Sequence, residues 1–126
     1  MNVKDTINCI IHIPEKYDDL ENASPISLLK ECGYIENHNQ IKENDIQEML
    51  IQHPDCINKW IQWFEDKRSE GWYFYRSDTG KYIVGSHSPD AAGYYSHSYS
   101  DGATACAAYI MKEVEHIWYY YEKKIE

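Results

Sequence analysis

Serine and histidine side chains gather in one stretch of this 126-residue chain. His87 lies between two serines, His97 lies between two more, and Asp90 lies in the segment that separates them. A serine nucleophile needs a histidine base within hydrogen-bond reach and an acid that orients the base, so these residue types are those of a small hydrolase. If His97 lies on a strand, however, its neighbouring serines point to the opposite face. We therefore interpret both histidines as polar strand and loop residues, and keep hydrolysis through His87 or His97 as an alternative.

Other chemistry is weakly indicated. The dipeptide Gly80-Lys81 lacks the glycine-rich surroundings of a phosphate-binding loop and fits a hairpin turn better. The four cysteines contain no C-x-x-C pair and lie more than twenty residues apart. They are Cys9, Cys32, Cys56 and Cys106. In a reducing compartment this spacing predicts separate, mostly buried thiols, with a disulfide or an assembled metal site as the alternative. We expect no cofactor and no metal ion.

The charge balance is acidic, with 12 Lys and Arg against 21 Asp and Glu and a net charge of −9 with His neutral. Residues 1–70 carry a balance of −7 and residues 71–126 a balance of −2. This disfavours direct nucleic-acid binding, which depends on basic residues that meet phosphates. Solvated surface is the ordinary role of such acids. The sharper hypothesis is an acidic patch that faces a basic partner, with Asp19 and Glu21 in a loop-like stretch. The residues assigned to it are Asp18, Asp19, Glu21 and Glu36.

Tyrosines are concentrated in the other half, where ten of the twelve follow Gly71. Tyr94, Tyr95 and Tyr99 flank His97 in a serine-rich stretch. Tyrosine offers a large contact area with little conformational entropy to lose, so we assign these four residues to the binding surface as well. The alternative is that every second residue packs into the core while the others face solvent.

The first seventy residues are predicted to be helical. Apolar residues three and four apart predict a first helix that Pro14 ends, although the residues from Ile11 onward fit a strand equally well. A second helix is predicted over residues 25–32, with Ser24 as its cap and Gly33 as a left-handed stop.

Two more helices follow. Asn44 is predicted to cap one that Pro54 closes. An apolar stripe of Ile57, Trp60, Ile61 and Phe64 predicts the other. These four residues are three and four positions apart, as on one face of a helix, and we expect that face to pack against the core.

The remaining residues predict an antiparallel meander and a long helix. Aromatic and β-branched runs separated by turn residues give strands over 72–75, 81–85 and 94–99. Asp101 or Ser100 caps a last helix whose apolar face is long enough to cover the sheet. The fold class is therefore α+β, with N-terminal helices, a three-stranded antiparallel meander and a long C-terminal helix packed on the sheet.

We expect a single domain over residues 1–126, mainly helical in 1–70, with the meander and the C-terminal helix in 71–126. A chain of this length buries enough surface to fold without a staple. It has no apolar run long enough to cross a bilayer and no secretory signal at its start, so we expect it in the cytoplasm, without a membrane partner. The sequence carries no signal for an oligomeric state.

Three stretches of the second half form a succession that covers about residues 71–118. They are Gly71-Trp72-Tyr73-Phe74-Tyr75, then Tyr82-Ile83-Val84-Gly85, then Asp101 followed by Ala105-Cys106-Ala107-Ala108-Tyr109-Ile110 with Glu113 and Ile117. This succession resembles the ending of small bacterial immunity proteins, the cytoplasmic inhibitors encoded beside contact-dependent growth inhibition and related polymorphic toxins. The resemblance implies a stoichiometric inhibitor with no catalysis of its own, which binds the C-terminal toxin domain that a neighbouring cell delivers. No active-site residues carry over from it.

The charge argument points the same way. Nucleases present basic grooves, and an acidic protein can occupy such a groove where phosphates would lie. We therefore expect a non-enzymatic immunity protein whose partner is a basic nuclease toxin, with an RNA-cleaving RNase or tRNase as the favoured target. The main alternative is a small scaffold module that binds a peptide along the sheet edge.

Overall fold

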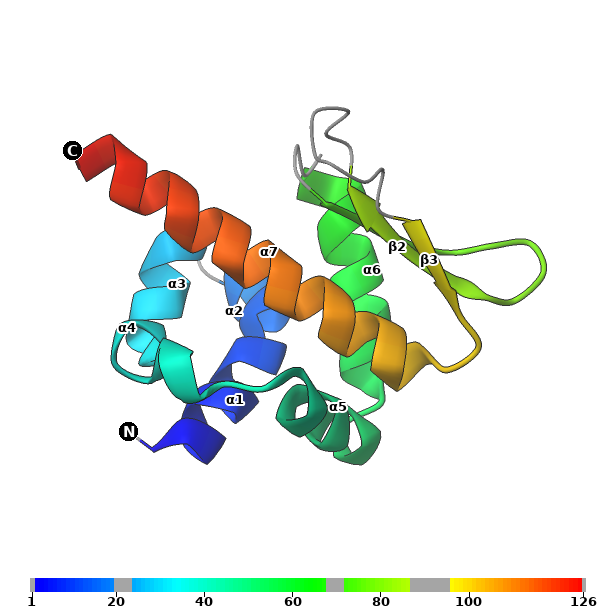
Figure 1. Ribbon diagram of the computed structural model, residues 1–126, viewed down its shortest axis with the longest axis horizontal. Helices are drawn as coiled ribbons and strands as arrows, with labels where there is room; N and C mark the ends of the chain where they lie inside the picture. Colours follow the sequence, from blue (N-terminus) through cyan, green and yellow to red (C-terminus); the bar gives the residue numbers. More distant parts are fainter. Residues whose placement is uncertain (1, 20–23, 68–71, 87–95, 126) are drawn as a thin grey trace.

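A long C-terminal helix, α7 (Gly102–Ile125), crosses the molecule and contacts both a small sheet and the other helices (Figure 1). The computed structural model describes residues 2–19, 24–67, 72–86 and 96–125. The helices before the sheet are α1 (Val3–Ile11), α2 (Ile13–Asp19), α3 (Pro25–Glu31), α4 (Tyr34–Asn37), the 3-10 helix η1 (His38–Gln40), α5 (Glu43–Gln52) and α6 (Asp55–Lys67). The strands are β1 (Trp72–Arg76), β2 (Tyr82–Ser86) and β3 (Ser96–Tyr99). The predicted α+β arrangement, with the C-terminal helix packed on the sheet, is confirmed.

The sheet is the predicted antiparallel meander, in the order β1-β2-β3. Gly80 adopts a φ of 83° in the turn between β1 and β2, where its N–H donates to the Ser77 carbonyl at 2.9 Å. This positive φ is the reason a glycine suits the position. The third strand begins at Ser96, and the part of the predicted strand that holds Tyr94 and Tyr95 lies outside the described residues.

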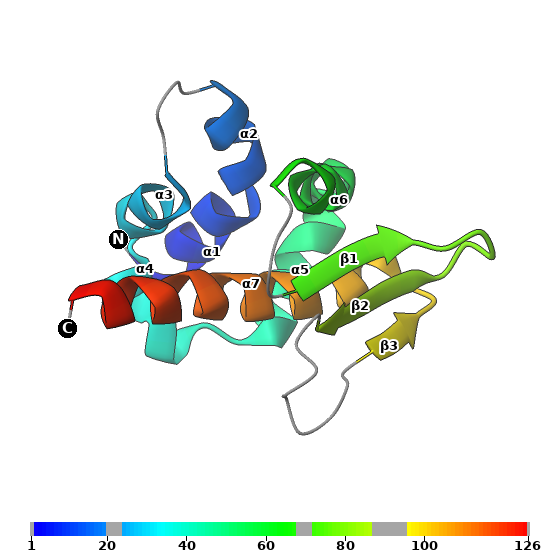
Figure 2. The same cartoon turned by 90° about the horizontal axis from the view of Figure 1, so that it is seen from above.

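The register sets the two faces of the sheet. Phe74, Val84 and His97 lie opposite one another and therefore share a face. Phe74 and Val84 are buried on that face, where the Phe74 ring stacks on Tyr109 of α7 with ring centres 5.3 Å apart. The other face carries Tyr75, which is 42% exposed. One side of the sheet thus belongs to the core beneath α7 and α6 (Figure 2).

Small residues bring α7 close to the sheet. Ala103, Ala105 and Ala107 are buried near its first turns. At Gly102 a Cβ atom would lie 2.9 Å from the far end of the Tyr82 ring, closer than carbon atoms pack, so a larger residue would have to displace that ring. The absence of bulk on this part of α7 lets the helix cover the sheet directly.

The predicted start and stop of the second helix are confirmed. Ser24 caps α3 by accepting a hydrogen bond from the Ser27 N–H at 3.2 Å, and Pro25 occupies the first helical position. Gly33 has a φ of 79°, which a residue with a side chain adopts only at a cost. The same glycine precedes α4, so it turns the chain between two helices.

Two local predictions about helix ends are wrong. The first helix ends at Ile11, and Pro14 lies in the first turn of α2 rather than closing α1. A first-turn proline loses no intrahelical hydrogen bond, so it favours the start of a helix there, and the strand alternative at Ile11 is also wrong. Asn44 lies inside α5, which begins at Glu43.

The predicted apolar stripe of α6 is confirmed at Trp60, which is fully buried, whereas Ile57, Ile61 and Phe64 are half-buried. Trp63 is only 4% exposed although the stripe omits it. The reason is that α6 contacts α2 on one side and β1 and α7 on the other, so its buried surface is wider than one stripe.

The prediction of four separate thiols is wrong for one pair. Cys9 on α1 and Cys32 at the end of α3 form a disulfide, with Cα atoms 5.3 Å apart. These residues meet because α1 packs beside the segment that joins α3 to α4, a long-range contact that spacing alone does not reveal. Cys56 and Cys106 are buried free thiols, as expected.

Burial shapes the chemistry of both free thiols. It raises the pKa of the Cys56 thiol to about 11, and the carboxylates of Glu15 and Asp55 contribute to the shift. Burial also raises the pKa of Cys106 well above its ordinary value. Both cysteines are therefore protonated at neutral pH.

Within the described ranges, no helix combines the length and the apolar character that a membrane span requires.

Candidate interaction surface

The predicted acidic patch is spread over two helices. Asp18 is exposed on α2, and Asp19 is the last residue of that helix, so Asp19 lies on a helix rather than in the loop-like stretch expected for it. Glu36 is exposed on α4. Glu21 lies outside the described residues. Both α2 and α4 contact α3, which separates Asp18 from Glu36 along the surface.

The predicted tyrosine surface is described only in part. His97 is exposed on β3, and the Tyr99 ring lies beside it with ring centres 6.3 Å apart. Tyr94, Tyr95 and His87 lie outside the described residues. Strand β3 and helix α4 lie at opposite ends of the molecule, on either side of α7 (Figure 1). The structure therefore does not bring Glu36 and the β3 residues into one continuous surface.

His97 on β3 and its two sequence neighbours, Ser96 and Ser98, lie on opposite faces of the sheet. His97 pairs with Val84, whereas its neighbours Ser96 and Ser98 pair with Gly85 and Ile83 on the other face. In the described part of the chain, moreover, no three His, Cys, Asp or Glu side chains are grouped as metal ligands would be.

The described residues instead bring acids and aromatic rings together where α2 lies beside α6 (Figure 2). These two helices enclose a small hollow of about 30 Å³. We call this region the α2–α6 surface. It is lined by Pro14, Tyr17, Asp18, Lys59, Gln62, Trp63 and Asp66.

Aromatic rings form the floor of the α2–α6 surface. Tyr17 meets Trp63 edge to face, with ring centres 5.2 Å apart, and Trp63 lies 5.4 Å from Trp60 by the same measure. The Trp60 indole N–H donates to the Ile11 carbonyl at 3.0 Å, which fixes α6 against the end of α1. The floor is therefore held by packing and by a buried hydrogen bond.

Two acids and one base line the α2–α6 surface around that floor. Asp18 and Asp66 are exposed at its rim, one from each helix. Glu15 and Asp55 do not line the hollow; both raise the pKa of the Cys56 thiol, which places these two carboxylates near the first turns of the same helices. Lys59 is the base in the lining. Two carboxylates and one ammonium give this rim a small net negative charge around the aromatic floor.

Sequence reasoning assigned Asp18 to the binding surface but missed the contribution of α6. The lining residues of α6 are Lys59, Gln62, Trp63 and Asp66: the adjacent Gln62 and Trp63 lie three and four residues after Lys59, and Asp66 lies four and three residues after them. Such spacing places them on one face of the helix. This signal is present in the sequence, but only the packing of α2 against α6 shows that the face belongs to a shared surface.

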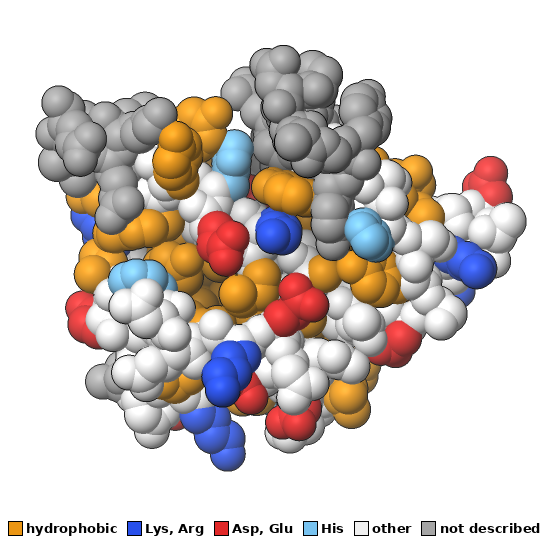
Figure 3. Space-filling model, viewed as in Figure 1, with side chains coloured by type: hydrophobic (Ala, Val, Ile, Leu, Met, Phe, Trp, Pro, Cys, Tyr) orange, Lys and Arg blue, Asp and Glu red, His pale blue; other side chains and the backbone are white. Residues whose placement is uncertain are grey.

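Two other depressions differ in character. One lies between α1 and α5, has a volume of about 410 Å³ and carries Lys4 together with Asp45 and Glu48. The other lies between α3 and α7, where Ile26, Ile117 and Tyr120 line a groove of about 300 Å³. The face of the molecule in Figure 3 shows acidic and basic side chains interspersed with hydrophobic ones.

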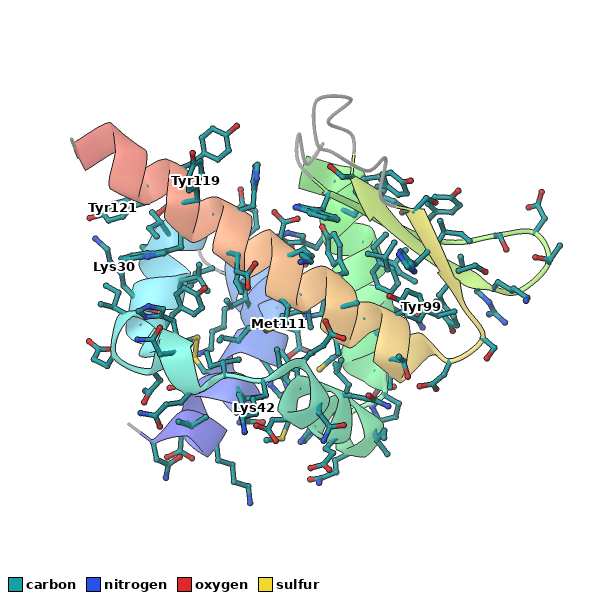
Figure 4. All side chains as sticks on the ribbon, in the orientation of Figure 1. Lys30, Lys42, Tyr99, Met111, Tyr119 and Tyr121 are labelled. Carbon is teal, nitrogen blue, oxygen red and sulfur yellow. A yellow bond between two sulfur atoms is a disulfide. The ribbon has the colours of Figure 1, made fainter. Side chains whose placement is uncertain are left out.

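Tyr121, which lines the α3–α7 groove, also makes a contact between the two helices. The Lys30 ammonium lies 4.1 Å from the centre of the Tyr121 ring and donates a hydrogen bond to its hydroxyl (Figure 4). A cation over an aromatic face is a favourable contact, so it ties α3 to the last turns of α7.

Comparisons of the chain with protein-family models, curated proteins and solved structures give no match.

Proposed function

We propose that this chain is an immunity protein, which neutralises a cognate toxin domain by covering the basic groove of a nuclease. The observation that carries the proposal is the negative rim around the aromatic floor of the α2–α6 surface. The net charge of −9 supports the same reading, as does the resemblance of residues 71–118 to the ending of such inhibitors.

Charge would guide the encounter. A nuclease groove binds phosphates through Lys and Arg, and its positive field attracts an acidic surface before contact. Asp18 and Asp66 would then take the place of substrate phosphates. Opposite charges of this kind speed association and exclude wrong partners more than they raise final affinity.

Aromatic residues would supply the affinity. Interfaces draw most of their binding energy from a few anchors, which are often Trp, Tyr or Arg, surrounded by residues that exclude water. Tyr17 is half-buried at the α2–α6 surface and is already held by Trp63. A side chain fixed in this way loses little entropy on binding.

The first experiment tests the function itself. The gene next to the one that encodes this chain is examined for a large secreted protein, and its C-terminal domain is expressed with and without this chain. We expect a one-to-one complex, loss of RNA cleavage and protection of the producing cells. Turnover of a substrate by this chain alone, or a toxin domain that cleaves RNA equally well in its presence, would contradict the proposal.

The second experiment tests the surface. We expect the double variant Asp18→Lys/Asp66→Lys to associate with the toxin domain about tenfold more slowly at low salt, because it reverses the field at the α2–α6 surface. The difference should shrink as salt screens the charges. The matched control is Asp78→Lys/Glu115→Lys, which changes the net charge equally at exposed positions in the β1–β2 turn and on α7. Equal association rates for the two double variants would exclude the α2–α6 surface.

One observation favours a scaffold module as a second candidate. Strand β3 is at the edge of the sheet, and Ser96, His97 and Ser98 are exposed on it. An extended peptide can add to such an edge through main-chain hydrogen bonds. This function predicts binding of a peptide without protection of cells that produce the toxin, so the protection assay separates the two candidates.

A further inference from the structure

The Cys9–Cys32 disulfide has two ends that differ in their access to solvent. Cys32 is 0% exposed at the end of α3, whereas Cys9 is half-buried on α1. Cys9 also lines an open hollow of about 460 Å³, to which Cys32 does not contribute. The Cys9 end of the disulfide therefore faces solvent through this hollow, whereas the Cys32 end does not.

A lysine lies against the accessible sulfur. The Lys16 ammonium, on α2, donates a hydrogen bond to Cys9 Sγ at 3.0 Å. Lys16 is itself half-buried and lines the same hollow. A positive charge at this distance favours a thiolate over a thiol and attracts an approaching anion.

The other titratable groups around the hollow lie on α1 and at the C-terminal caps of α1 and α5. Asp5 and His12 line it, one turn before and one turn after Cys9. The His12 ring is held by a hydrogen bond between Nδ1 and the Asn8 carbonyl at 2.7 Å, and by the His53 ring, whose centre is 5.3 Å away. Of these charged and titratable groups, Lys16 is the one that contacts the Cys9 sulfur directly.

We propose that Cys9 is a thiol-exchange site, at which a small external thiol is captured as a mixed disulfide beside Lys16. In the first step the external thiolate forms a bond to Cys9 Sγ, the bond between the two protein sulfurs breaks, and Cys32 leaves with the electron pair and takes a proton from water. The inference is independent of the toxin partner proposed above.

A second thiol completes the exchange. Its thiolate attacks the external sulfur of the mixed disulfide, and Cys9 leaves as a thiolate opposite the Lys16 ammonium. Two external thiols are then oxidised to one disulfide, while Cys9 and Cys32 are reduced. A thiol with a low pKa is the better leaving group, so Lys16 assists this step directly.

The two remaining cysteines stay outside this chemistry. Cys56 and Cys106 are buried, and their thiols remain protonated at neutral pH. Reactivity follows thiolate character and exposure, so neither thiol competes with Cys9. The peptide that carries an adduct of the folded chain therefore identifies the disulfide cysteine that has reacted.

The first test uses the oxidised, folded chain and glutathione as the probe. After an acid quench, peptide mapping by mass spectrometry should find glutathione on Cys9 and a free thiol at Cys32. Lys16→Met should form the adduct several-fold more slowly. The control is Lys4→Met. Lys4 lies in the same part of the chain but lines the α1–α5 depression and not the hollow beside Cys9, so this variant should form the adduct as fast as the unmodified chain does.

Several outcomes of this test would overturn the proposal. They are an adduct on Cys32, equal rates for Lys16→Met and Lys4→Met, and a chain that forms no Cys9–Cys32 bond after exposure to an oxidant.

The second test measures the reduced chain. The rate at which iodoacetamide alkylates Cys9 is followed against pH, and its midpoint should lie below the ordinary cysteine pKa of about 8.5. Lys16→Met should raise the midpoint by about one pH unit, which means about tenfold slower alkylation at neutral pH. Superimposed profiles for the two proteins would refute a role for Lys16. If the reduced chain loses its helical circular dichroism, the glutathione rates of the oxidised proteins decide alone.

Discussion

Asp101 shows how a single side chain fixes the start of the longest helix. Its carboxylate accepts hydrogen bonds from the Thr104 N–H at 3.0 Å and from the Thr104 hydroxyl at 2.6 Å. These bonds hold the pKa of Asp101 below its ordinary value of 3.8. The sequence offered both Ser100 and Asp101 as caps, and Asp101 makes the capping bonds.

We expect Asp101→Ala to lower the free energy of unfolding by about 1 kcal/mol at pH 7, because α7 loses its cap. The contribution depends on pH in a defined direction. A depressed carboxyl pKa stabilises the fold above the unfolded pKa, so the difference between the two proteins should decline as the pH falls below 3.8 through the lower folded value. Urea unfolding at several pH values measures this. Asp101→Asn keeps an acceptor and should lose less, and an equal loss in both variants at every pH would contradict the role of the carboxylate.

At the scale of elements, the junction between α3 and α4 depends on one backbone conformation. Gly33 has a φ of 79° there. We expect Gly33→Ala to destabilise the fold by about 1 kcal/mol, because a Cβ disfavours the left-handed region. Asn tolerates that region better, so Gly33→Asn should lose less stability in thermal or urea unfolding. If both variants match the unmodified chain, the junction does not need a left-handed residue.

Elements whose signals are local could be predicted from the sequence, and those that depend on distant packing could not. The cap at Ser24, the stop at Gly33 and the turn glycine at Gly80 depend on a few adjacent residues, whose conformational preferences act without the rest of the fold. The part of the candidate surface on α2 was found for a similar reason, since Asp18 belongs to a visible run of acids. Trp63 was missed because its burial arises only when α2 and β1 cover two sides of α6.

The disulfide is the clearest case of missing long-range information. Cys9 and Cys32 are 23 residues apart in sequence, and nothing in their spacing selects this pair over the others. It takes the packing of α1 beside the end of α3 to bring their Cα atoms to 5.3 Å. The lysine at the Cys9 sulfur is a further consequence of that packing, because α2 turns back beside α1.

At the scale of the whole molecule, α7 joins parts that the sequence divides by composition. It contacts α3, α5 and α6 of the acidic helical half, and all three strands of the tyrosine-rich half. Ile110 lies near the middle of this helix and is 0% exposed. A core that both halves share through one helix should unfold in one step, as small single domains do.

We therefore expect Ile110→Ala to lower the free energy of unfolding by about 2–4 kcal/mol, because it leaves a cavity in that shared core. Two probes follow unfolding in urea: far-ultraviolet circular dichroism, which reports mainly the helices, and the fluorescence of Trp72 in a chain whose other tryptophans are replaced by Phe. The substitution should shift the unfolding midpoints of both probes by the same amount. Ile51→Ala is the matched control, since Ile51 is 62% exposed on α5 and its loss should change stability by less than about 0.5 kcal/mol. Two separate transitions, with only one moved by Ile110→Ala, would show that the helical part and the sheet fold independently and that α7 belongs to just one of them.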